Sequence, residues 1–117
     1  MQEHIYKICS LEEWSAAEAA GVYAGSPKDR EDGFIHFSLS VQLAGTLAKY
    51  YADADHLVLV AVRAAALGES LRYEPSRDGA LFPHLYATLP LTAVVWTKEI
   101  GRGGAGAFVL PDEIVAI

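Results

Sequence analysis

The six consecutive apolar residues LVLVAV, at positions 57–62, decide the fold of this chain. A run of this length is typical of a strand, and both of its faces are apolar. Half-exposed strands alternate between apolar and polar residues, so a strand without alternation is covered on both sides. We therefore expect residues 57–62 to form a central strand.

Two helices are predicted on the N-terminal side of this strand. Residues 11–20 follow a first strand at 4–9 and begin after Ser10, which forms a capping box with Glu13 because each side chain satisfies a backbone N–H of the other. Residues 41–51 carry an apolar stripe with helical spacing, so we expect a second helix there.

The remaining segments complete the expected architecture. Residues 22–33 are rich in turn formers and charge and predict a surface loop. Extended segments are expected at 34–38, 71–74, 81–89, 91–97 and 107–110. Helices early in the chain and strands later favour an α+β fold with a mixed, twisted sheet and two or more short helices.

Composition narrows the class of protein. The chain has 117 residues, 52% of them hydrophobic, so we expect one folded domain over residues 1–117. No apolar run reaches the ~18 residues of a membrane helix, which predicts no membrane partner. The net charge is −6 with scattered basic residues, which argues against non-specific nucleic-acid binding. The single cysteine, Cys9, predicts a cytoplasmic protein with an inert core thiol.

The strand at 34–38 carries the first candidate site residues. Ile35 and Phe37 share an apolar face, whereas His36 and Ser38 point the other way. Such a mixed face suits the wall of a cleft, where an imidazole and a hydroxyl can bind a ligand. In the alternative interpretation, His36 donates to a buried carbonyl and only holds the sheet.

A second histidine lies in the segment LFPHLY. Phe82, His84 and Tyr86 share a face if this segment is extended, and together they can stack on a flat ring and hydrogen-bond its edge. The alternative is that Pro83 makes a bend that His84 caps.

Charged residues on two other strands are further candidates. In LRYE, Arg72 and Glu74 lie on one face, where arginine can bind a phosphate and glutamate can stabilise a developing cation. The alternative is an exposed strand of ion pairs. Lys7 stands among apolar neighbours and either supplies a positive charge to a cleft or protects an edge strand from aggregation.

The pattern of histidines and cysteines predicts no metal site. The histidines are at positions 4, 36, 56 and 84, without metal-ligand spacing, and there is one cysteine. The sequence GRGGAG at 101–106 lacks the order of a dinucleotide fingerprint.

Four motifs in order resemble a known bacterial family. IYKI at 5–8, DGFIHFS at 32–38 followed by Gln42, LRYE at 71–74 and LFPHLY at 81–86 are similar to the family called domain of unknown function 952. That family is grouped with the ADP-ribosyltransferase-like fold. The resemblance implies a split mixed sheet with a nucleotide-sized cleft between its halves.

The resemblance also implies roles for individual residues. Catalytic roles fall on His36 and Glu74, and ligand-binding roles fall on Lys7, Ser38, Arg72, Phe82, His84 and Tyr86. No cofactor is firmly implied, but NAD is the implied substrate class, so the partner is a small molecule.

Two functions remain open at this point. The protein is either an enzyme that transfers or hydrolyses ADP-ribose or a module that binds a small ligand without chemistry. A carboxylate that faces His36 across the cleft would favour the enzyme, because it stabilises the cationic ribose as nicotinamide leaves. We also expect His36, His84 and Arg72 to line one concavity.

Overall fold

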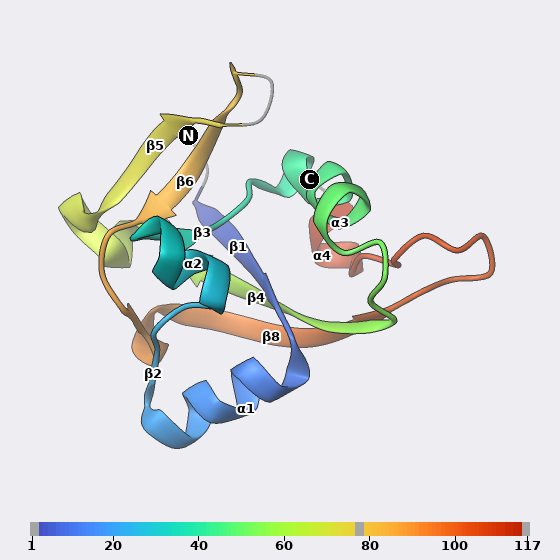
Figure 1. Cartoon of the computed structure of the whole chain (residues 1–117), viewed down its shortest axis with the longest axis horizontal. Helices are drawn as coiled ribbons and strands as arrows, with labels where there is room; N and C mark the ends of the chain where they lie inside the picture. Colours follow the sequence, from blue (N-terminus) through green and yellow to red (C-terminus); the bar gives the residue numbers. More distant parts are fainter. Residues whose placement is uncertain (1–2, 77–78, 116–117) are drawn as a thin grey trace.

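The computed structural model describes residues 3–76 and 79–115 (Figure 1). Its helices and strands follow in the order β1 (His4–Cys9), α1 (Leu11–Ala20), β2 (Val22–Tyr23), α2 (Pro27–Asp32), β3 (Ile35–His36), α3 (Leu43–Tyr50), β4 (His56–Arg63), β5 (Leu71–Pro75), β6 (Leu81–Leu85), β7 (Leu89–Pro90), β8 (Val94–Gly101) and α4 (Asp112–Val115). The expected α+β class is confirmed.

Two three-stranded sheets form the framework among these residues. One has the order β1-β4-β8 and the other β3-β6-β5, while β2 pairs with β7. All of these pairs are antiparallel, so the expected mixture of parallel and antiparallel strands is wrong for the described part of the chain. The reason lies in the connections, because the helices link strands of different sheets and do not return the chain to a parallel neighbour.

The strand β4 is central, as its sequence predicts. It lies between β1 and β8, and residues 57–62 are buried. The even-numbered valines of β4 belong to one core cluster with Trp14 of α1, and its odd-numbered residues belong to another with Leu43 and Leu47 of α3. Burial of each such side chain contributes about 1.5–3 kcal/mol. No helix in the described ranges is long and apolar enough to cross a bilayer.

The prediction of a surface loop at 22–33 is wrong. The segment contains β2 and α2, and α2 begins after Ser26, which forms a capping box with Asp29. Pro27 occupies the first turn, where its missing N–H costs nothing, and Gly33 ends the helix with a φ of 86°. Asp29 is buried against the rest of the molecule, so this charged segment is part of the core and not a solvated loop.

Other element boundaries shift without changing the arrangement. Only Ile35–His36 of the expected strand at 34–38 pairs with β6, and Ser38 forms an isolated bridge with Tyr6 of β1. The last long strand begins at Val94 because Leu91–Ala93 forms a turn of 3₁₀ helix. The segment at 107–110 makes a single bridge, between Arg102 and Phe108, and no strand.

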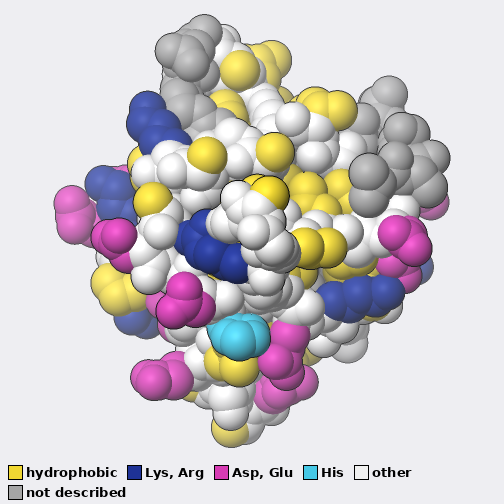
Figure 2. Space-filling view, turned by 90° about the vertical axis from the view of Figure 1, so that its right-hand side faces the viewer, with side chains coloured by type: hydrophobic (Ala, Val, Ile, Leu, Met, Phe, Trp, Pro, Cys, Tyr) yellow, Lys and Arg dark blue, Asp and Glu magenta, His cyan; other side chains and the backbone are white. Residues whose placement is uncertain are grey.

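On the side occupied by α3 and α4, the basic side chains of the described residues are dispersed over the surface (Figure 2). Figure 2 shows this face, where lysine and arginine side chains form separate small groups among acidic ones. This distribution is unlike the continuous positive surface that tracks a nucleic-acid backbone.

The close approach of Gly25 to Asp29 gives a first prediction. Gly25 has a φ of +103°, and an added Cβ would lie 2.9 Å from the Cβ of Asp29. We expect Gly25→Ala to lower the free energy of unfolding by about 1–3 kcal/mol, because the backbone is strained and the core is pushed apart. Urea unfolding measures this loss. The matched control is Gly104→Ala, whose added Cβ meets nothing within 4 Å. Equal stability of the two variants would contradict the expectation.

Candidate functional site

A cavity of about 610 Å³ is lined by residues of both three-stranded sheets. Its walls come from β1, α2, β3, α3 and β6, and its aromatic lining consists of Tyr6, Phe37, Tyr50, Tyr51 and Phe82. Cavities that bind small molecules have volumes of roughly 300–1,000 Å³ and combine apolar walls with a few polar groups. The cavity therefore has the size of a ligand site.

The Asp29 carboxylate organises the polar wall of this cavity. It accepts hydrogen bonds from the Lys7 ammonium at 2.7 Å, from the Ser26 backbone N–H at 2.9 Å, and from His36 through its backbone N–H at 3.1 Å and Nδ1 at 2.6 Å. Lys7 also donates to the His36 carbonyl oxygen at 3.0 Å. One carboxylate thus connects β1, the start of α2 and β3.

Asp29 stays ionised although it is buried. Burial alone would raise the pKa of its carboxyl group, but the hydrogen bond from His36 and the charge of Lys7 hold that pKa well below its usual range. The side chains of Lys7 and Asp29 are only 4% and 2% exposed, so this ion pair is screened little by water. Its two charges neutralise each other inside the site.

The imidazole of His36 contacts two carboxylates. Its Nδ1 lies 2.6 Å from Asp29 Oδ1 and its Nε2 lies 3.0 Å from Asp32 Oδ2. Both contacts are hydrogen bonds only if both ring nitrogens carry protons, so this geometry fits a positively charged imidazole. Asp32 is also 3.5 Å from the Lys28 ammonium. The described residues contain no group of three His, Cys, Asp or Glu side chains that could hold a metal ion.

His84 belongs to a second polar group. Its Nδ1 lies 2.8 Å from Glu74 Oε1, and the Tyr86 hydroxyl donates to the same oxygen at 2.7 Å. These two hydrogen bonds, from Tyr86 first and His84 second, lower the pKa of Glu74 and keep it ionised. The guanidinium of Arg72 lies 5.2 Å from the centre of the Tyr86 ring.

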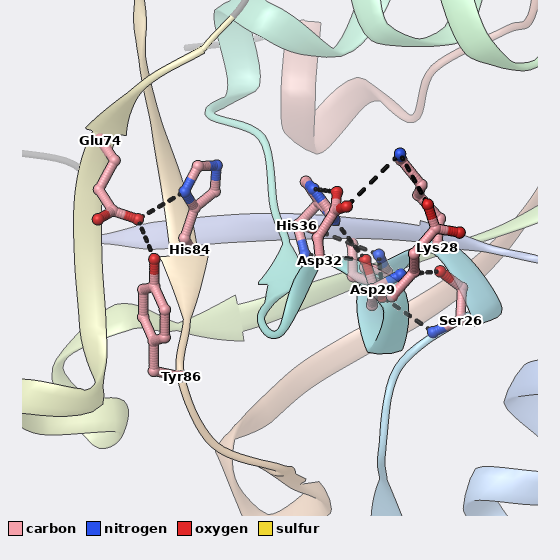
Figure 3. A network of polar contacts seen from close by, with 10 residues as sticks. Ser26, Lys28, Asp29, Asp32, His36, Glu74, His84 and Tyr86 are labelled. Atoms are coloured by element: carbon pink, nitrogen blue, oxygen red, sulfur yellow. Dashed lines mark hydrogen bonds and ion pairs between the residues drawn. The ribbon is translucent and has the colours of Figure 1, made fainter.

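The two imidazoles lie next to each other, between their carboxylate partners. Figure 3 shows Glu74 on one side of His84, and Asp29 and Asp32 on the far side of His36. His36 and His84 are directly opposite in the pairing of β3 with β6, and their ring centres are 5.6 Å apart. The Phe34 ring stacks on the His84 ring, with ring centres 4.1 Å apart, and its centre lies 4.7 Å from that of His36. These contacts restrain both imidazoles.

The structure brings most of the predicted site residues to one place. The cavity lining includes Lys7, His36, Ser38, Phe82 and His84. The lining does not include Arg72, Glu74 or Tyr86. These residues lie next to His84, on the same face of the sheet but outside the cavity. Arg72 is directly opposite His84 in the strand pairing, but its guanidinium lies over Tyr86 and not in the cavity.

The local alternatives raised by the sequence do not describe the observed contacts. His36 binds carboxylates and not a buried carbonyl, and His84 binds Glu74 and does not cap a bend at Pro83. Lys7 lies in an edge strand, yet it is buried in an ion pair.

Sequence reasoning missed Asp29 and Asp32. Both lie in the segment interpreted as a loop, where a serine followed three residues later by an acidic residue, with proline between them, is a helix-start signal. That signal identifies α2, but it does not reveal that Asp29 reaches Lys7, which is 22 positions away in the chain.

The buried ion pair gives a second prediction. Lys7→Met leaves the Asp29 charge without its ammonium partner, so we expect a loss of about 3–5 kcal/mol in the free energy of unfolding. The matched control is Lys98→Met, which removes a half-exposed partner of Glu113. That change should cost at most about 1 kcal/mol. Denaturant unfolding measures the free energy of unfolding of both variants. An equally small loss in both would show that the Lys7–Asp29 ion pair contributes little to stability.

The low pKa of Asp29 gives a third prediction, on acid stability. Because this pKa is lower in the folded chain than the ordinary 3.8, the contribution of Asp29 is complete above that value and is lost as the pH falls below it. We expect the free energy of unfolding to fall more steeply between about pH 4 and pH 2 in the wild type than in Asp29→Asn. Parallel slopes in urea unfolding across this range would contradict the role of Asp29.

Comparisons with known proteins place the chain in a family. Residues 8–97 match the family model described as protein of unknown function (DUF952). The crystal structure of protein CC0527 from Caulobacter crescentus is 44% identical, with a TM-score of 0.89 over 96% of this chain and 98% of that chain. The solution NMR structure of CC0527 is 42% identical, with a TM-score of 0.86 over 99% and 100% of the two chains. No curated protein matches the chain significantly. The chain therefore belongs to the DUF952 family of proteins of unknown function.

Proposed function

We propose that the protein binds a nucleotide-sized small molecule in the 610 Å³ cavity. NAD and ADP-ribose are the first class to test, because the resemblance of the sequence motifs implies an ADP-ribosyltransferase-like fold. The observation that carries the proposal is the cavity itself, in which two imidazoles and several hydroxyl-bearing side chains, among them Ser38 and Thr46, meet an aromatic wall. Such a combination suits a ligand with a flat base and a ribose.

The polar groups of the cavity have different tasks in this proposal. Lys7 is neutralised by Asp29, so it positions His36 and does not bind a phosphate directly. Lys28 lines the cavity with a side chain that is 69% exposed, and it is the lysine that can turn toward a phosphate. Stacking of the base falls to aromatic side chains of the wall, including Tyr50.

Transfer or hydrolysis of ADP-ribose is the second candidate function. It is favoured by the ionised Glu74, which can stabilise the cationic ribose that forms as nicotinamide leaves. Glu74 is bound to His84 and Tyr86 and does not line the cavity, so a ligand would have to reach past His84 to meet it. Binding is therefore the better supported of the two functions.

The proposal gives a fourth prediction, on ligand binding. We expect NAD or ADP-ribose at millimolar concentration to shift amide NMR signals of β1, β3 and β6 residues that line the cavity. Tyr50→Ala should weaken this binding about 2- to 10-fold through lost stacking. The matched control is Tyr73→Ala, since Tyr73 is exposed on β5 but lies outside the cavity lining. Absence of shifts, or equal affinities of the two variants, would contradict the proposal.

A further inference from the structure

We infer that His36 and His84 form a general acid–base pair that hydrolyses the cyclic phosphate of a ribonucleotide. The inference rests on the proposed binding of a nucleotide in the cavity and names a reaction for it. It starts from the adjacency of the two rings, which both line the cavity with centres 5.6 Å apart.

Each imidazole is held by a carboxylate through the same nitrogen. Nδ1 of His36 binds Asp29 and Nδ1 of His84 binds Glu74, and both carboxylates are ionised. A carboxylate on Nδ1 fixes the orientation and the tautomer of a catalytic histidine, so that Nε2 is the nitrogen that exchanges protons with the substrate. Two such pairs on neighbouring strands provide two proton-transfer groups in one place.

The surroundings of the two rings assign them different roles. His36 contacts carboxylates through both nitrogens, and a doubly protonated ring satisfies both contacts, so His36 is assigned the role of the acid. Nδ1 of His84 donates to Glu74, so in the neutral ring Nε2 keeps the lone pair and can act as the base. The carboxylates that contact the pair are those of Asp29, Asp32 and Glu74. Lys7 lies beside Asp29, Lys28 beside Asp32, and Tyr86 and Arg72 beside Glu74. Two titratable side chains of one kind, placed in different environments, commonly serve as the acid and the base of a catalytic site.

The position of Asp32 shows where an anionic oxygen can contact His36, the proposed acid. Its Oδ2 is 3.0 Å from His36 Nε2, and its side chain is 28% exposed at the end of α2. When a cyclic phosphate enters the cavity, the ribose ester oxygen that will leave phosphorus takes the place of this carboxylate on Nε2. Lys28, which is now 3.5 Å from Asp32, is then released to meet the phosphate charge.

The reaction balances with water as the only co-reactant. His84 Nε2 takes a proton from a water molecule, whose oxygen forms a bond to phosphorus. The bond between phosphorus and one ribose oxygen breaks, and that oxygen receives the proton of His36 Nε2. The products are a nucleoside monophosphate and an enzyme whose two imidazoles have exchanged protonation states, which solvent restores.

This chemistry fits the pair better than the loss of nicotinamide does. Nicotinamide leaves NAD as a neutral molecule and needs no proton, whereas a ribose oxygen is a poor leaving group until it is protonated. A single cyclic nucleotide also suits a cavity of 610 Å³ on a protein whose basic residues are scattered.

The test uses the four nucleoside 2′,3′-cyclic monophosphates, with ring opening followed by phosphorus NMR. We expect turnover by the wild type, with kcat lowered about 100-fold or more in His36→Gln and in His84→Gln. The matched control, His56→Gln, changes an exposed imidazole outside the cavity and should keep the wild-type rate. Asp32→Asn should lower KM, because the anion no longer competes with a carboxylate for His36. Circular dichroism and nucleotide-induced NMR shifts establish that each variant is folded and binds.

The outcomes separate this inference from the proposed binding function. Cavity shifts with the cyclic nucleotide but no ring opening would overturn the acid–base pair and leave nucleotide binding intact. Full activity in folded His36→Gln or His84→Gln would overturn it as well. Ring opening without any response to NAD or ADP-ribose would support the pair and reject the ADP-ribose class. No binding of any of these nucleotides would reject both.

Discussion

The buried carboxylate of Asp29 is the constraint on which the site depends. A charge in this position is tolerated only because an ammonium, two backbone N–H groups and an imidazole surround it. These four donors come from β1, from the turn before α2 and from β3, so satisfying one charge fixes three segments relative to each other. The position and orientation of His36 follow from this requirement, because two of the four donors belong to that residue.

The site is consequently nearly neutral although many of its residues are ionised. Lys7 is balanced by Asp29, and Lys28 lies beside Asp32. In the proposed function, recognition of a ligand therefore depends on the aromatic walls and on exchange of hydrogen-bond partners more than on a net electrostatic field. Asp32 and Lys28 are the partners best placed for such exchange, since both are partly exposed and neither is held as firmly as Asp29.

The sequence alone predicts the fold where the signals are local. The run at 57–62 correctly identifies the central strand, and the capping box at Ser10 correctly identifies α1. Strand alternation places His36, Ser38 and His84 on mixed faces, and the family resemblance favours a cleft there; all three line the cavity. Asp29 is not found, because its importance comes from Lys7, which lies 22 positions earlier. A charged, turn-rich segment looks solvated until the partner that buries it is known. The direction of strand pairing likewise depends on where each helix returns the chain, which no local pattern records.

The junction between the two sheets has a consequence for their relative motion. Tyr6 and Ser38 exchange two backbone hydrogen bonds, of 2.9 and 2.8 Å, and this pair joins β1 to the segment after β3 (Figure 1). The contacts of Lys7 with Asp29 and with the His36 carbonyl connect the same two sheets beside this pair, so a backbone bridge and a buried polar cluster act together at the junction. In the proposed function, a molecule that contacts both walls of the cavity therefore acts on these few contacts and favours the spacing of the sheets that it fits.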